Sequence, residues 1–119
     1  MVNSIVHTAI ARKMLCSPVN SLIADTEFAC AAGMLLRLIK VRKETAEKAG
    51  EIATVKELQK WLFEGFAREL EGDFDIRCRN LISMLKNYRA EENPFTPQLQ
   101  ELFALGFEQE IVYPKGRFL

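Results

Sequence analysis

The sequence predicts an all-α fold: a compact bundle of four to five helices around a long central helix, with a short extended C-terminal arm over residues 108–119. Apolar residues recur at intervals of three and four through most of the chain, which is the helical period. The few prolines and glycines fall between these stretches, where helices end. A chain of 119 residues fits one domain, so we expect a single helical domain over residues 1–119.

The first predicted helix covers residues Ser4–Leu15 and ends before Pro18, because a residue that precedes proline is pushed out of the helical conformation. It carries His7, the single histidine of the chain. No nucleophile signature surrounds His7, so we expect an ordinary helix residue and not a catalytic base.

The second predicted helix is the centre of the bundle. It begins near Asn20 or at Asp25 and continues to Ala49. Its first half, Phe28–Leu36, is apolar on every side, which predicts burial all round, whereas its second half is polar and predicts exposure. Gly33 in the apolar half predicts either the close approach of another helix or a bend.

The third predicted helix starts with a capping box, in which Thr54 is the N-cap and Glu57 the third helical residue. It runs to about Leu70 with one strongly apolar face. Trp61 and Phe63 flank this face on either side. The apolar arc is therefore wider than a helix on the surface of a monomer needs.

Two further helices and one strand-like segment complete the chain. Asp73 or Asp75 caps the fourth predicted helix, which runs to about Arg89. Pro97 stands at the first position of the fifth, and Gly106 is expected to close it. The strand-like segment that follows contains Ile111, Val112 and Tyr113. It predicts an arm packed on the helices or an edge offered to a partner.

The charges cancel overall but are segregated along the chain. There are 16 basic and 16 acidic residues, so the formal net charge is zero. Residues 1–50 hold seven bases and four acids, a charge of +3, and residues 51–119 hold nine bases and twelve acids, a charge of −3. The balance argues against a bulk polyanion binder, while the segregation favours oriented binding to a specific partner.

Several function classes lack their signatures. Three widely spaced cysteines and one histidine do not make a zinc site, and we expect the cysteines to be reduced, as in a cytoplasmic protein. The longest apolar run has nine residues, too few to span a membrane. Glycine-rich phosphate loops and hydrolase motifs are absent. The acidic run Glu69–Asp75 is interpreted as helix capping and not as a metal site. We therefore expect no cofactor, no metal and no catalysis.

The favoured interpretation is a small cytoplasmic protein-interaction module, such as an adaptor, inhibitor, immunity or assembly factor. Trp61 and Phe63 are the predicted anchors, because aromatic residues are enriched at protein interfaces. The partner is another protein or, in a homodimer, a second copy. The electrostatic rim is expected at Arg37, Lys40, Arg42 and Lys43, and a docking strand at Ile111, Val112 and Tyr113.

The alternative is a nucleic-acid-binding regulator that resembles a helix-turn-helix protein in part. Residues 54–58 would open the first helix and residues 76–82 would form the recognition helix. The contacts to phosphate would come from Arg77, Arg79, Lys86 and Arg89, together with the basic end of the central helix. Neighbouring carboxylates would repel phosphates, which makes this the less favoured interpretation.

Overall fold

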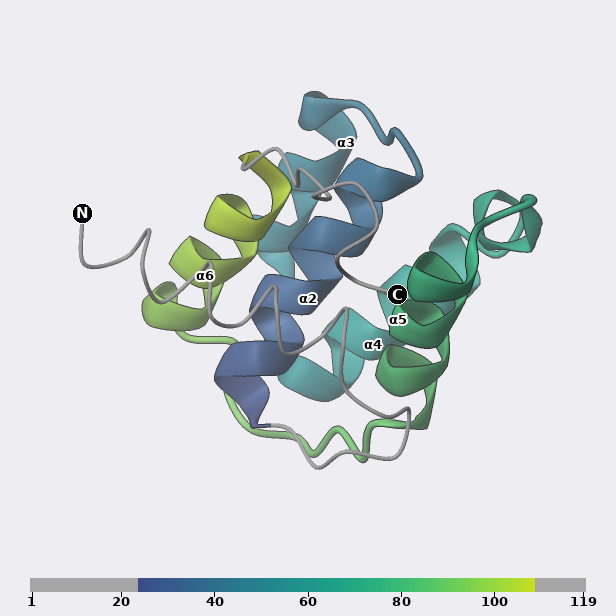
Figure 1. Ribbon diagram of the computed structural model, residues 1–119. Helices are drawn as coiled ribbons and strands as arrows, with labels where there is room; N and C mark the ends of the chain where they lie inside the picture. The colour runs from purple at the N-terminus through teal and green to yellow at the C-terminus, as the bar shows by residue number, and fades with distance from the viewer. Residues whose placement is uncertain (1–23, 109–119) are drawn as a thin grey trace.

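The computed structural model describes residues 24–108, and this part of the chain is an all-α bundle, as the sequence predicts. Figure 1 shows its helices in order along the chain. They are α2 (Asp25–Leu38), α3 (Lys43–Ala46), the 3-10 turn η1 (Glu47–Glu51), α4 (Val55–Gly65), the 3-10 turn η2 (Glu69–Glu71), α5 (Ile76–Asn87) and α6 (Pro97–Glu108). Within these residues the only β-type pairing is an isolated bridge between Thr54 and Pro94.

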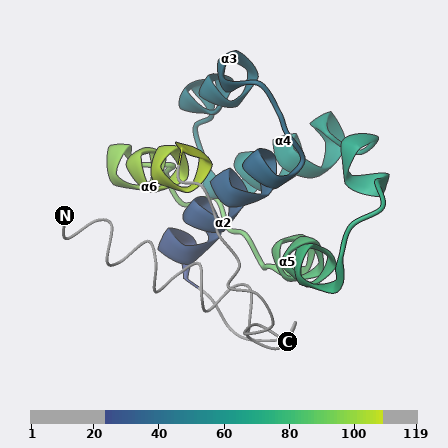
Figure 2. The same ribbon diagram turned by 45° about the horizontal axis from the view of Figure 1, so that its top comes forward.

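Helix α2 is the central element, with α6 on one side and α5 on the other (Figures 1 and 2). All nine residues Phe28–Leu36 are buried, which confirms the prediction from their all-round apolar pattern. Among residues 24–108 no helix is long and apolar enough to cross a membrane.

The tightest packing in the bundle joins α2 to α6 through two glycines. A Cβ atom on Gly33 would lie 2.1 Å from the carbonyl oxygen of Phe103, and one on Gly106 would lie 2.2 Å from the carbonyl oxygen of Cys30. Each helix thus presses its backbone onto a glycine of the other. Of the two expectations for Gly33, close helix approach is the correct one. The prediction that Gly106 closes the last helix is wrong, because Gly106 lies inside α6 at this crossing.

The prediction of one helix up to Ala49 is also wrong, because α2 ends at Leu38. Lys40 adopts a left-handed conformation with φ of 61°. The N–H of Val41 donates to the carbonyl of Leu36 (3.0 Å) and that of Lys40 to Arg37 (3.1 Å). These two bonds form a Schellman motif, which ends a helix and satisfies its last carbonyls. Glycine usually occupies the left-handed position, so a lysine there gives no sequence signal.

Helix α4 begins as predicted and ends earlier. The Thr54 hydroxyl accepts from the Glu57 N–H (3.1 Å), while the Glu57 carboxylate accepts from the Ala53 N–H (3.2 Å). The carbonyls of residues 93 and 91 accept from the first two N–H groups of the helix. The helix ends at Gly65 and not at Leu70, since Phe66 leaves the helical conformation and its ring packs in the core.

Helix α5 is capped by Asp75, one of the two predicted candidates, which accepts from the Cys78 N–H (3.0 Å). Helix α6 begins at Pro97 as predicted, and the Thr96 hydroxyl before it accepts from the Leu99 N–H (3.2 Å). Helix α5 ends at Asn87, two residues before the predicted end, and α6 continues to Glu108. The predicted helix at residues 4–15, His7 and the strand-like segment at residues 110–113 lie outside the described residues.

A group of polar side chains fixes the end of α5 against α4 and α2. The Gln59 amide donates to the carbonyls of Leu85 (2.9 Å) and Tyr88 (2.7 Å). The Tyr88 hydroxyl donates to Asp25, and its ring stacks on Phe28 with a centroid distance of 4.6 Å. Burial, followed by the bond to the Asp25 carboxylate, raises the pKa of Tyr88. These contacts join the three helices at one end of the bundle.

The glycine crossing leads to a stability prediction. Gly33→Ala is expected to lower the free energy of unfolding by about 3 kcal/mol or more, because the new methyl group overlaps backbone atoms that cannot rotate away. Urea unfolding followed by circular dichroism measures the change. Gly50→Ala is the matched control, since a Cβ there meets nothing within 4 Å, and should be neutral or stabilising by up to about 1 kcal/mol. Equal effects of the two substitutions would contradict the assignment.

The two described cysteines predict a loss of stability at alkaline pH. Both are free and buried, and burial raises the pKa of Cys30 to about 12 and of Cys78 to about 11 from an ordinary 9.0. Above pH 9 the unfolded thiols ionise while the folded ones stay protonated. Each thiol should therefore cost roughly 1 kcal/mol of stability by pH 10.

Urea unfolding at pH 8 and pH 10 tests this, in a Cys16→Ser background that removes the third thiol. The Cys30→Ala, Cys78→Ala variant should lose less stability between the two pH values than its parent. The comparison cancels the titration of groups common to both proteins. An equal loss in the two proteins would refute the expectation.

Candidate functional site

Four exposed cations gather at one end of the bundle, where α2 gives way to α3 (Figure 1). This basic corner consists of Arg37, Lys40, Arg42 and Lys43. Arg37 lies in the last turn of α2, and Lys43 begins α3. On an unbroken helix the four side chains would be spread around the helix axis, because successive residues differ by about 100°. The Schellman turn instead leaves three of them, Lys40, Arg42 and Lys43, beyond the end of α2.

Lys40 holds this corner in shape at an energetic cost. A left-handed conformation costs a residue with a side chain about 1–2 kcal/mol, and glycine would avoid that cost. Lys40 is the only residue other than glycine with a positive φ among residues 24–108. Strained backbone of this kind is often found at functional sites, where the side chain has a role besides folding.

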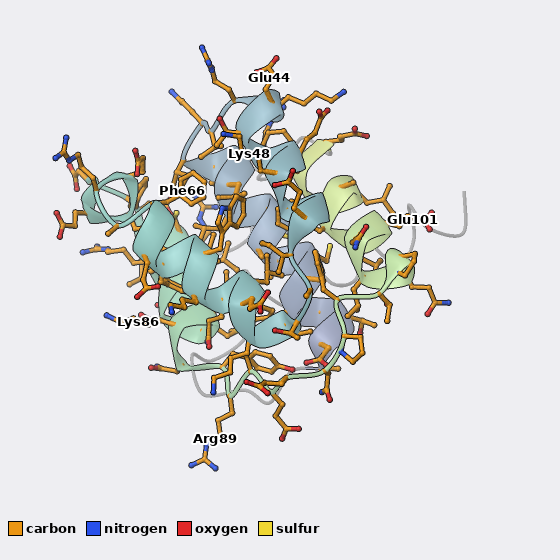
Figure 3. The ribbon with its side chains drawn as sticks, turned by 180° about the vertical axis from the view of Figure 1, so that it is seen from behind. Glu44, Lys48, Phe66, Lys86, Arg89 and Glu101 are labelled. Atoms are coloured by element: carbon orange, nitrogen blue, oxygen red, sulfur yellow. The ribbon has the colours of Figure 1, made fainter. Side chains whose placement is uncertain are left out.

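An apolar groove lies next to the basic corner, between α3–η1 and α6. Figure 3 shows these elements from behind, with Glu44 and Lys48 labelled on α3–η1 and Glu101 on α6. The groove has a volume of about 60 Å³ and an apolar wall made of Ala46, Phe103, Ala104 and Phe107. We call it the α3–α6 groove. Its rim carries three charged residues, Lys43, Glu47 and Glu108.

Lys43 belongs to both features. Its ammonium nitrogen lies 3.8 Å from a carboxylate oxygen of Glu108 across the groove. Both side chains are about 60% exposed, so this ion pair is solvated and readily exchanged for another partner. The basic corner and the α3–α6 groove thus form one continuous surface, apolar in the groove and positive at one side.

The predicted anchors take a different position. The Trp61 ring is half-buried against Phe66 (centroid distance 5.0 Å, edge to face) and Phe103 (6.4 Å). Its outer side borders a shallow, open hollow whose lining is mostly apolar and includes Ile52, with the charged residues Glu57, Lys60 and Glu64 also in its lining. Phe63 is also half-buried against the core. Two residues apart on α4, these side chains point to nearly opposite sides of the helix and do not form one patch.

The basic residues of α5 are separate from the basic corner. Arg79, Lys86 and Arg89 are exposed, while Arg77 is half-buried and its guanidinium lies 3.2 Å from the Asp75 carboxylate. In Figure 3 Glu44 lies at the top of the view, whereas Lys86 lies at the lower left and Arg89 at the bottom. Residues 66–75 connect α4 to α5, and this connection is longer than the three- or four-residue turn of a helix-turn-helix.

The acidic loop, residues 69–75, acts locally as the sequence predicts. Hydrogen bonds from the Cys78 N–H and then from Arg77 lower the pKa of Asp75, which caps α5. The other three carboxylates, Glu69, Glu71 and Asp73, are exposed. Within the described range no group of three or more histidine, cysteine, aspartate or glutamate side chains is arranged to hold a metal ion.

Ile111, Val112 and Tyr113 lie outside the described residues, so the predicted docking strand has no structural counterpart here. The groove residues, in contrast, are absent from the predicted site. Phe103 and Phe107 are four residues apart with Ala104 between them, a pattern typical of any helix that packs on a core. The position of Ala46 opposite them follows only from the end of α2 at Leu38.

Comparison with known proteins places the chain in a family. A family model described as a domain of unknown function (DUF3837) matches residues 1–110. The chain therefore belongs to this family. No curated protein and no solved structure matches it.

The strained turn predicts that the basic corner is not optimised for stability. Lys40→Gly should raise the free energy of unfolding by about 0.5–1 kcal/mol, since glycine adopts φ of 61° without steric cost. Lys40→Val should lower it by a similar amount or more, because a β-branched residue is disfavoured there. Urea unfolding of the two variants beside the wild type measures both changes. A destabilised glycine variant would contradict this account of the turn.

Proposed function

We propose that this member of the DUF3837 family is a small non-enzymatic protein of the cytoplasm that works by binding an acidic segment of another protein chain. The basic corner and the α3–α6 groove are the proposed binding surface. The observation that carries the proposal is their continuity through Lys43. An adaptor, an inhibitor, an immunity protein or an assembly factor would all use such a surface.

The chemistry of this surface suits one apolar side chain flanked by carboxylates. An apolar side chain gains free energy on entering the groove, at about 25 cal/mol per Å² of surface buried. The exposed cations of the basic corner would attract acids beside it, which speeds encounter and fixes orientation. The strain at Lys40 supports the same role, because a lysine occupies a left-handed position that glycine would adopt without steric cost.

A binding role without catalysis is consistent with the thiols. Cys30 and Cys78 are buried, and their raised pKa values leave few thiolates at neutral pH, so they are poor nucleophiles. Free cysteines also fit the reducing cytoplasm.

Nucleic-acid binding through α5 is the second candidate, because Arg79, Lys86 and Arg89 are exposed. The acidic loop directly precedes this helix, and its carboxylates would repel phosphates. Glu44 and Glu47 are exposed beside the basic corner, and they would likewise repel phosphates there. A folded acidic partner tolerates such mixed charge better than an extended polyphosphate does.

Site-specific photo-crosslinking in the native host tests the proposed function. A photoreactive phenylalanine derivative at Ala104, on the groove wall, should form an adduct with a discrete protein. The same group at Gln98, exposed on α6 and outside the groove, is the matched control and should form none. Arg37→Glu combined with Arg42→Glu should reduce the Ala104 adduct at least tenfold, because these substitutions reverse the charge of the corner.

Three results would overturn the proposal. The first is an equal amount of adduct from Ala104 and Gln98, and the second is an Ala104 adduct that charge reversal at Arg37 and Arg42 leaves unchanged. The third is binding of generic RNA or DNA in gel shifts at low salt that the Arg79→Glu, Lys86→Glu double variant loses. The last result would establish the nucleic-acid alternative.

A further inference from the structure

We infer that the α3–α6 groove binds a second copy of this chain, which inserts Ile76 into the groove and places its acidic loop against the basic corner. This inference rests on the proposed function for the site and goes further by naming the partner. It is carried by four features: one exposed aliphatic side chain, a groove with an apolar wall, complementary charge, and the placement of the two surfaces on the molecule.

Ile76 is the one exposed large hydrophobic residue among residues 24–108, with 52% of its surface accessible. Its exposure does not come from loose backbone. It is the first residue of α5, directly after the Asp75 cap, and the N–H groups of Cys78 and Arg79 are both bonded to Asp75. Phe74, just before the cap, packs against the core. The side chain is therefore held outward by a fixed helix start.

The α3–α6 groove is small, at about 60 Å³, and its wall is made of aromatic rings and alanine methyl groups. This apolar lining suits an aliphatic side chain such as that of isoleucine. Ala104, the exposed member of the wall, leaves the groove open to an incoming side chain.

Opposite charges stand beside the two features. On the loop side of Ile76 are the exposed carboxylates Glu69, Glu71 and Asp73. The basic corner reaches the rim of the groove at Lys43, which lies 3.8 Å from the rim acid Glu108. Docking that places the acidic loop of one copy against the basic corner of another therefore pairs opposite charges.

The two surfaces of one molecule cannot meet each other. Ile76 begins α5 and the groove is walled by α6, and these helices lie on opposite sides of α2 in both ribbon views (Figures 1 and 2). The contact therefore joins separate copies. Two copies exchange isoleucines reciprocally in a two-fold dimer, or each copy offers its isoleucine to one neighbour and its groove to another, which builds rings or open chains.

Complementary variants test the inference in the full-length chain. Ile76→Asp removes the inserted side chain and keeps the groove, whereas Ala104→Glu fills the groove and keeps the isoleucine. Both positions are exposed, so neither change disturbs the core. Each variant alone should sediment as a monomer, and an equimolar mixture should form a one-to-one dimer, because one intact contact remains between them. Gln98→Glu, exposed on α6 outside the groove, is the control and should self-associate like the wild type.

Analytical ultracentrifugation over a concentration series measures the association. The wild type should form species larger than a monomer, and its dissociation constant should rise at least tenfold between 50 mM and 500 mM salt, since the pairing is partly ionic. Charge reversal at Arg37 and Arg42 should weaken the association to a similar degree.

Several outcomes would overturn the inference. They are a wild type that stays monomeric at every concentration, oligomers that persist in Ile76→Asp, and a variant mixture that does not dimerise. A monomeric wild type whose Ala104 position still crosslinks to a host protein would refute the second copy as partner and leave the proposed function standing. A monomer that forms no such adduct would refute both.

Discussion

The contact of two backbones at the α2–α6 crossing sets the rest of the structure. Carbonyl oxygens of Cys30 and Phe103 occupy the space where Gly106 and Gly33 lack side chains. Helices this close pack together extensively, so α6 covers one side of α2. The other sides are left to α4 and α5. Phe103 and Phe107 on α6 are buried, and α3–η1 lies beside them. The groove is the gap that remains between α3–η1 and α6.

Local hydrogen bonding made part of the fold predictable. In the caps of α4 and α5 a side-chain oxygen accepts from the backbone N–H three residues later. The sequence pattern therefore identifies Thr54 as a cap and reduces the choice for α5 to Asp73 or Asp75. The end of α2 could not be found in this way. It depends on the backbone conformation of Lys40, a residue that ordinarily continues a helix, and on the burial of Val41 against the core. The sequence pattern therefore overestimates the length of the central helix, which ends at Leu38.

The same distinction applies to the candidate site. The four cations of the basic corner are neighbours in the sequence, so their grouping is predictable, although three of them lie beyond the end of α2 and not within one long helix. The groove joins residue 46 to residues 103–107, and no local pattern connects segments so far apart. For Trp61 the local pattern is ambiguous. The wide apolar arc of α4 favours a partner, but part of that arc is the Trp61 ring, which packs on Phe66 and Phe103 of the same chain.

The segment that precedes α6 has a consequence for how the chain can vary. The Phe95 N–H donates to the Ala53 carbonyl (2.8 Å) and the Val55 N–H to the Asn93 carbonyl (2.9 Å), so the chain returns at residues 93–95 to the point where α4 begins. The direction of α6 is set there and not by the far end of the α4–α5 pair. At that far end Phe66 and Phe74 are held by the core and Asp75 by its cap, whereas Glu69, Glu71 and Asp73 are exposed. Exchange of these three side chains would change the charge of the loop and leave the place of α6 unaltered.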